Sequence, residues 1–327
     1  MWKRLVGPML AALVAGACGG AANAAAPNNL IAATGAPSSL AGDDGAWKDA
    51  GVMTVKTAVI AGSAAKQGAE VKVQALYSST DIWFRFEWAD STQSADRFWL
   101  YDGAKWTSSG NEDRLALLWE ISPLERFQTH GCTAVCHNPV SDPIAKWYMV
   151  TPGADDRADN WQWIAGRTNP VGQADDKYLV GALPDPASTG SSFVNDTSEK
   201  GGSANNRTAD GSGPAKMQDP SKPASAGSGF LLASEAVTID ASKFKAGDKV
   251  PRDLLAPSVG SRGDIDAKGV YASGKWTVVF HRKLDTKNDD DIQFVVGRTI
   301  PFGLAVFDNV SGFSHTVAGE PLYLRFR

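Results

Sequence analysis

The sequence predicts an all-β protein, built as a single β-sandwich with irregular loops and a long low-complexity surface insertion. Apolar and polar side chains alternate in residues 70–77 and again in residues 82–88, and the polar turn 78–81 joins these segments into a hairpin. Few segments show a helical period beyond one or two turns. Many short strands separated by turn residues are typical of a sandwich or a barrel.

Further strand candidates are spread over the whole chain. They are residues 52–60, 114–121, 274–284, 291–297, 301–308 and 322–326. Each half of the chain would hold only about four strands, so we expect neither half to fold alone. We therefore predict one domain over residues 46–327, and the sequence contains no evident internal repeat.

Three stretches are predicted to be irregular. Residues 25–45 are rich in Ala, Gly, Pro, Ser and Asn, and we expect a flexible N-terminal segment. Residues 184–229 are a low-complexity run of Ser, Gly, Pro, Asn, Asp and Lys, which predicts a long surface loop inserted into the sandwich. Residues 122–170 show no clear strand pattern, and they contain the cysteine and histidine motif on which the functional prediction rests.

Residues 1–24 have the features of a secretory signal peptide. Lys3 and Arg4 precede an apolar run from Leu5 to about Ala17, and small residues up to Ala24 offer a cleavage site. That run is too short to span a membrane, and no later segment reaches about 18 apolar residues. We therefore expect export to the periplasm and no membrane span.

The cysteines are few and unevenly placed. Cys18 would leave with the signal peptide. A lipid anchor at Cys18 is the less favoured alternative, because Ala15 stands where a large aliphatic residue is normally required. Cys132 and Cys136 remain in the exported chain. A disulfide between them is possible in an oxidising compartment, but it would close a very small loop.

The motif Cys132-Thr-Ala-Val-Cys136-His137 indicates covalent haem. The usual attachment signature is C-x-x-C-H, and this chain has one residue more between the cysteines. Each thiol can add to one porphyrin vinyl group, and the adjacent His137 can serve as an axial iron ligand. The sequence therefore predicts one haem c, attached through Cys132 and Cys136.

Two residues are candidates for the second axial ligand. Met149 follows His137 by twelve residues and stands beside two aromatic residues. His315 lies in a Gly/Ser-containing loop between two predicted strands, and loops on rigid scaffolds often carry function. Methionine ligation would raise the reduction potential and histidine ligation would lower it.

Charge and motif content exclude several classes of function. Thirty-two Lys and Arg against 36 Asp and Glu give a formal net charge of −4, without a basic patch. Nucleic acid and anionic membranes are therefore not expected as partners. No acid–base pair or nucleophile triad stands near the haem motif, so we expect an electron-transfer protein and not an enzyme in its own right.

Three segments, residues 159–170, 276–284 and 302–308, together resemble the ethylbenzene-dehydrogenase-related haem-binding family. Its members include the haem b subunits of type II molybdenum enzymes of the dimethyl sulfoxide reductase class. The resemblance covers roughly residues 45–327, interrupted by the low-complexity stretch. It implies a β-sandwich that holds haem at one end, and it places Met149 at the position of the family's methionine ligand.

The chain departs from the family pattern in its second ligand and its cysteine motif, and the resemblance suggests further residues that contact haem. The b-type members use a lysine as their second ligand, and the matching neighbourhood here supplies His315 instead. Those members also lack the C-x-x-x-C-H motif, so this chain is similar to a c-type branch of the family. Trp161 and Trp163 are candidates for the haem wall, with core packing as an equally open role, and Arg167 is a candidate propionate contact.

These observations predict a periplasmic monohaem c-type cytochrome that carries single electrons between redox partners, such as a molybdenum enzyme or another cytochrome. One alternative is the haem subunit of a molybdenum oxidoreductase complex, relaying electrons from its iron–sulfur subunit. A haem enzyme or gas sensor with an open distal site is a second alternative. An exported β-sandwich with a disulfide and no haem is the third.

Overall fold

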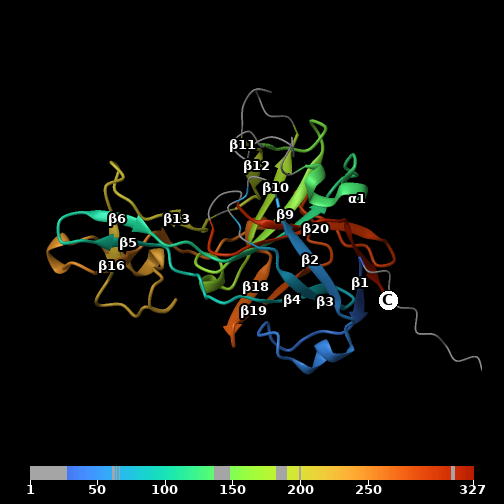
Figure 1. Ribbon diagram of the computed structural model, residues 1–327, viewed down its shortest axis with the longest axis horizontal. Helices are drawn as coiled ribbons and strands as arrows, with labels where there is room; N and C mark the ends of the chain where they lie inside the picture. Colours follow the sequence, from blue (N-terminus) through green and yellow to red (C-terminus); the bar gives the residue numbers. More distant parts are fainter. Residues whose placement is uncertain are drawn as a thin grey trace, which may run out of the picture.

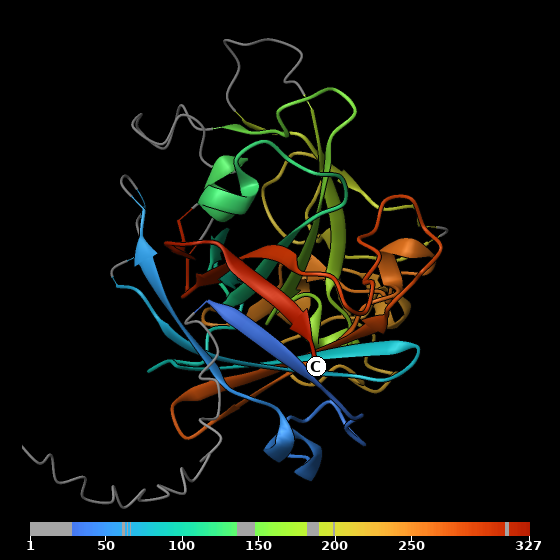
Figure 2. The ribbon, with the colours of Figure 1, turned by 90° about the vertical axis from the view of Figure 1, so that its right-hand side faces the viewer.

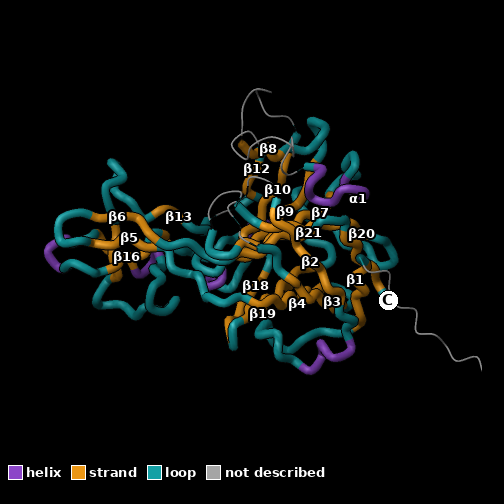
Figure 3. Tube along the Cα trace, in the orientation of Figure 1, coloured by secondary structure: helices purple, strands orange, loops and turns teal. Residues whose placement is uncertain are grey.

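The computed structural model describes residues 28–135, 148–181, 190–310 and 314–327, apart from residues 61, 62, 64, 66 and 199. Strands dominate these residues, and their α-helical part is the single turn α1 (Phe127–His130), as Figure 3 shows. The predicted all-β class is confirmed. The predicted signal peptide lies outside the described residues, as do Cys136 and His137.

Two β-layers pack face to face (Figures 1 and 2). The first layer contains, in spatial order, β12 (Phe193–Asn195), β10 (Asp175–Val180), β9 (Arg157–Ile164), β7 (Arg114–Glu120) and β20 (Ile300–Phe307). The second layer contains β3 (Glu70–Tyr77), β4 (Asp81–Ala89), β19 (Lys275–Lys283) and β18 (Asp266–Ala272). Neighbouring strands within each of these series are antiparallel.

Strands near the two chain ends join the layers along one edge. Strand β1 (Asn29–Thr34) pairs first with β22 (Leu322–Phe326) and then with β3. Strand β2 (Met53–Val59) pairs with β3 through its first half and with β21 (Thr316–Ala318) through its second half. Both β21 and β22 pair with β20. Because β1 and β2 each pair with strands of both layers, the described strands on this side of the sandwich are paired along their edges.

Most of the predicted strands are present, but β9, β10 and β18 were not predicted, and two further segments differ from their predictions. Residues 29–34, predicted to be flexible, form β1, because Leu30 and Ala32 are buried in the core and parallel pairing fixes the backbone. Residues 291–297, predicted to be a strand, form none. The backbone N–H of Ile292 donates to the carboxylate of Asp159 (2.9 Å), and that of Phe294 donates to the carbonyl of Leu284 (2.8 Å). These bonds hold the segment in an irregular conformation outside the sheet ladders.

Much of the predicted low-complexity loop belongs to a lobe beside the sandwich, at the left of Figure 1. Its strands are β5 (Phe98–Tyr101), β6 (Trp106–Ser109) and β16 (Lys249–Pro251) in one sheet, and the pairs β13 (Ala204–Asn205) with β17 (Asp253–Leu254) and β14 (Lys216–Gln218) with β15 (Ala236–Thr238). The fully buried Asn206 orders this region. Its amide group donates to the carbonyls of Lys216 and Pro251 and accepts from two backbone N–H groups. Polar contacts, which composition does not reveal, hold the stretch in place.

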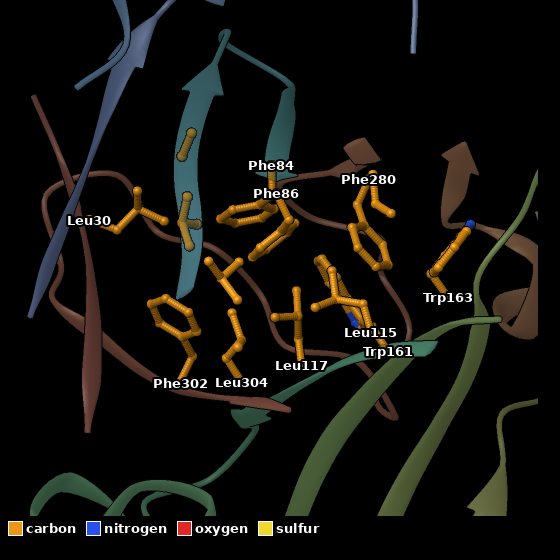
Figure 4. Packing of buried hydrophobic residues seen from close by; sticks show 14 of the residues in the cluster. Leu30, Phe84, Phe86, Leu115, Leu117, Trp161, Trp163, Phe280, Phe302 and Leu304 are labelled. Atoms are coloured by element: carbon orange, nitrogen blue, oxygen red, sulfur yellow. The ribbon is translucent and has the colours of Figure 1, made fainter. Parts of the chain in front are cut away.

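Aromatic side chains fill the core between the layers (Figure 4). Trp119 of β7 stacks on Phe302 with ring centroids 4.8 Å apart and lies 5.4 Å from Trp161 of β9. Phe84 of β4 approaches Trp119 from the second layer at 5.3 Å. These rings bury large apolar areas and add offset or edge contacts, so they stabilise the packing of the two layers.

Close backbone packing makes Gly269 of β18 necessary. A Cβ atom at this position would lie 2.1 Å from Cζ2 of Trp163, which is itself fully buried. The backbone of Gly269 also exchanges two hydrogen bonds with the side chain of Asn169. The indole therefore has no room to move away from an added methyl group.

We expect Gly269→Ala to destabilise the protein by about 1–3 kcal/mol, because the added methyl overpacks the core against Trp163. Urea unfolding followed by tryptophan fluorescence measures the change. Gly51→Ala is the matched control, since a Cβ there meets no heavy atom within 4 Å. Equal unfolding free energies for the two variants would contradict this account of the packing.

Candidate functional site

A cavity lies on the outer face of the first layer, the face turned away from the second layer. Side chains of β7 alternate, with Leu117 in the aromatic core and Ala116 and Leu118 on the outer face. Gly303 and Ala305 of β20 line the cavity beside them. Both faces of this layer are therefore covered, one by the second layer and the other by the segments around the cavity.

The chain after β7 covers one side of this cavity. The backbone N–H of Leu124 donates to the carboxylate of Glu120 (3.0 Å), which turns the chain back over the layer. Helix α1 ends at Gly131, whose φ of 58° favours glycine, and the 3-10 helix η2 (Gly131–Ala134) follows. This turn directs Cys132 back onto β20.

Cys132 packs directly against the backbone of β20. A Cβ atom on Gly303 would lie only 2.5 Å from Cβ of Cys132, so glycine is required for this approach. The side chain of Cys132 is 6% exposed and lines the cavity, and burial raises the pKa of its thiol to about 12. Its thiol forms no disulfide among the described residues. Cys136 and His137, which follow Val135, lie outside them.

Met149 borders the same cavity and is fixed by backbone pairing. It belongs to the short strand β8 (Tyr148–Met149), which pairs in parallel with β11 (Gly190–Ser191). The carbonyl of Met149 accepts hydrogen bonds from the backbone N–H (2.9 Å) and hydroxyl (3.0 Å) of Ser192. The next residue, Val150, donates to the carbonyl of Val135 (3.2 Å), which ties Met149 to the segment that holds Cys132.

His315 reaches the cavity from the loop before β21. Its side chain is 4% exposed, and its ring centroid lies 4.5 Å from that of Phe307. The hydroxyl of Ser63 donates to the His315 carbonyl (3.1 Å) and holds the backbone. Cys132, Met149 and His315 come from distant parts of the sequence, and the structure brings all three to one cavity.

Two cationic side chains at the cavity were not foreseen from the sequence. Arg114 lies with its guanidinium carbon 4.1 Å from the ring centroid of Phe307 and donates to the carbonyl of Val310 (2.9 Å). Burial, the largest influence, lowers the pKa of Arg114 to about 10. Lys177 lines the cavity from β10 and pairs with Asp175 at 2.6 Å. The sequence did hold one signal for Arg114, because it is an arginine at the start of a mostly apolar strand.

Polar residues of β9 also face the cavity. Asn160 and Gln162 line it, while their neighbours in the strand point into the aromatic core. The carboxamide of Asn160 donates to the carbonyl of Leu117 on β7 (3.0 Å). The alternation of amide and tryptophan side chains along β9 marks a strand with two different buried faces, and region 122–170 is therefore not wholly irregular.

Three predicted site residues do not line the cavity. Trp161 and Trp163 are fully buried in the core between the layers, where Trp163 packs against Trp276 at 4.9 Å. Their structural position is that of packing residues. Arg167 instead binds Glu112 through two nitrogens at 2.9 Å each, beside a second ion pair from Arg97 to Glu112. Strand alternation explains the position of the two tryptophans, because odd positions of β9 face the core, whereas the ion pair with Glu112 explains the position of Arg167.

A family model described as "Ethylbenzene dehydrogenase" matches residues 44–316. The chain belongs to the ethylbenzene dehydrogenase family. This family is linked to an oxidoreductase complex. The predicted family resemblance is confirmed. No curated protein matches the chain. Among the described residues, no helix is long and apolar enough to cross a membrane.

Solved structures share a weak likeness with this chain. A carbohydrate-binding module of family 9 from Caldicellulosiruptor kristjanssonii, in complex with cellotriose, is 9% identical with a TM-score of 0.32, covering 91% of this chain and 93% of that chain. A putative carbohydrate-binding protein from Bacteroides uniformis is 8% identical with a TM-score of 0.36, covering 92% and 99%. These likenesses are too weak to bear on what this chain binds.

We expect Gly303→Ala to displace Cys132 from β20, because the added methyl would occupy the space of the cysteine Cβ. In haem-free protein the Cys132 thiol should then react faster with iodoacetamide, since exposure lowers its raised pKa. Timed alkylation followed by peptide mass spectrometry measures the rate at this residue. Gly319→Ala, which places a Cβ in open space, should leave the rate unchanged. Equal rates in both variants would refute the proposed contact.

Proposed function

We propose that the protein is a periplasmic monohaem c-type cytochrome that carries single electrons between redox partners. The observation that supports this most directly is the shared cavity of Cys132, Met149 and His315. A thiol, a thioether and an imidazole are the side chains that attach haem or ligate its iron. Membership of the ethylbenzene dehydrogenase family agrees with a role in electron transfer.

The residues around the cavity fit a covalently attached haem. Cys132 would form one thioether, and the sequence motif supplies Cys136 for the second and His137 as one axial ligand. Arg114 and Lys177 line the cavity and would supply positive charge for the two haem propionates. The bound haem would supply reversible one-electron chemistry. The chain's own contribution is to hold the group, shield it from water and set its potential.

Met149 is the preferred second axial ligand and His315 the alternative. Both side chains are buried beside the cavity, so burial alone does not separate them. Pairing of β8 with β11, together with the hydrogen bond from Val150 to Val135, fixes the backbone around Met149. The ring of His315 packs on Phe307 and its carbonyl accepts a hydrogen bond from Ser63, so local contacts hold both candidates in place. The family's methionine ligand also corresponds to Met149.

Side chains at the cavity favour a raised reduction potential. Alanine, leucine and phenylalanine make up much of the cavity wall, and an apolar surrounding disfavours the more highly charged oxidised iron. Buried Arg114 adds positive charge, which stabilises the state that holds one more electron. Lys177 contributes less, because Asp175 compensates its charge at 2.6 Å.

Covalent attachment is the first test of this proposal. Protein made with a haem-maturation system should show one haem by pyridine haemochrome assay, and its mass should rise by one haem group. Cys132→Ala should leave a single thioether, seen as a shifted haemochrome band. Full-length protein without covalent haem would refute the proposed function.

The second axial ligand is tested by Met149→Leu, a substitution that keeps the side-chain volume. We expect the variant to lose the far-red charge-transfer band of the oxidised protein and to have a lower reduction potential. His315→Asn is the matched comparison and should keep that band. If only His315→Asn alters the low-spin spectrum, His315 is the ligand and Met149 is a packing residue.

A subunit role in a molybdenum oxidoreductase complex is the second candidate, and the family relationship favours it. In that setting the haem would receive electrons from an iron–sulfur subunit. Affinity purification of the full chain from its native host distinguishes the two roles. Recovery without an associated molybdenum enzyme supports an independent carrier.

Rapid carbon monoxide binding to the reduced protein would instead indicate an open distal site, as in a gas sensor.

A further inference from the structure

A group of buried carboxylates lies apart from the cavity, where β9 and β10 meet the loop that follows β19. Asp159 and Asp176 are 0% exposed, and Asp196 and Asp291 are each 2% exposed. One oxygen from each of Asp159, Asp176 and Asp291 lies within 4.8 Å of the others, and the same holds for Asp196, Asp290 and Asp291. Asp291 belongs to both sets, so the carboxylates form one continuous cluster.

Positive charge in this cluster is far below the negative charge. Arg282 of β19 is fully buried and pairs with Asp159 (3.2 Å) and Asp291 (3.4 Å). No other Lys or Arg of the described residues forms an ion pair with these five aspartates. One guanidinium therefore faces several carboxylates in a place that water hardly reaches, and burying unpaired charge is costly.

Asp176 and Asp196 are the least satisfied members. All four of their carboxylate oxygens are buried and have no hydrogen-bond donor among the described residues. The two side chains face the rest of the cluster rather than solvent, since Asp176 is close to Asp159 and Asp196 is close to Asp290 and Asp291. Buried carboxylates in folded proteins are normally hydrogen-bonded, ion-paired or bound to a metal.

We propose that Asp176, Asp196 and Asp291 bind one Ca²⁺ ion. The cluster offers oxygen atoms only, which suits a hard cation and excludes sites that depend on nitrogen or sulfur. Carboxylates from separate segments, without a regular geometry, match the flexible coordination of Ca²⁺ with six to eight oxygens. Mg²⁺ usually keeps several of its waters, and a buried group of side chains leaves little space for them.

The electrostatics of the cluster agree with a bound cation. Burial, and then the charges of Asp159, Asp290 and Asp291, raise the pKa of Asp196 to about 9. Burial and the neighbouring carboxylates likewise raise the pKa of Asp176 well above its ordinary value. Without a cation, protons must therefore neutralise part of the cluster near neutral pH. A divalent ion would replace those protons and stabilise the charged carboxylates.

Ca²⁺ at this position would connect three segments of the chain. Asp176 belongs to β10, Asp196 follows β12 at the start of the path into the lobe, and Asp291 lies in the loop after β19. The same region is linked by hydrogen bonds from Thr197 and Ser261 to Asp290 (3.2 and 2.9 Å). The ion would thus fix the base of the lobe to both layers of the sandwich.

The test uses the full-length protein as purified, and again after EGTA treatment and gel filtration. We expect one tightly held Ca²⁺ per chain by elemental mass spectrometry, and a heat of binding when Ca²⁺ is returned. Ca²⁺ should raise the thermal unfolding midpoint, because an ion that binds only the folded state stabilises it. Mg²⁺ at equal concentration should produce a smaller shift. Absence of both the heat and the shift would show a protonated carboxyl cluster and overturn the proposal.

Asp196→Asn locates the ion. We expect Ca²⁺ affinity to fall by about tenfold or more, since a charged ligand is replaced by a neutral one. In EGTA near neutral pH the variant should unfold at a higher temperature than the wild type, because Asp196 must take up a proton on folding and asparagine need not, and in Ca²⁺ the order should reverse. A variant that is less stable under both conditions, with unchanged Ca²⁺ affinity, would overturn the assignment.

Asp308→Asn is the matched control. Asp308 belongs to a separate acidic group with Asp90 and Asp113, far along the sheet order from β10. Its substitution should leave Ca²⁺ affinity and the Ca²⁺-dependent shift unchanged. Loss of binding in Asp308→Asn, with binding retained in Asp196→Asn, would place the ion at that other group and refute the proposed site. None of these readouts depends on haem or on electron transfer.

Discussion

Burial of the first layer on both faces is the constraint on which the rest of the structure depends. One face packs aromatic rings against the second layer, and the other carries the cavity. All seven residues of β7 are buried, so each side chain must suit one of two different surroundings. Strand alternation assigns Trp119 to the core and Leu118 to the cavity side, and the same rule places the residues of β9 and β20.

Period-two patterns predicted β2, β3, β4, β7, β19, β20 and β22, and they missed β9, β10 and β18. The patterns could not say which buried face a residue occupies, so Trp161 and Trp163 were candidates for a cavity wall and proved to be core residues. Residue chemistry and position singled out Cys132, Met149 and His315, which the fold brings to one cavity. The sequence did not point to Arg114 and Lys177, since a cationic side chain on a strand is usually solvated. Only the fold shows that these two side chains line the cavity.

Polar contacts account for the other differences between sequence and structure. The lobe contains little apolar sequence, yet Asn206 joins three backbone segments through its carboxamide. Likewise, the segment around Phe294 has a strand-like composition, but its backbone bonds to a carboxylate and a neighbouring turn. Such hydrogen bonds join residues that are distant in sequence, so they cannot be predicted from local composition.

The parallel pairing of β1 with β22 has a consequence for the order of folding. Residues 29–32 pair with residues 323–326, which are distant in sequence, so the joined edge cannot close until both segments are present. Contacts between segments this far apart in sequence slow folding, because a large loop must close before they form. Strand β20, whose Gly303 lies against Cys132, takes β22 as a partner along residues 300–302. The contact that buries Cys132 therefore rests on a strand whose pairing is completed only by a distant part of the chain.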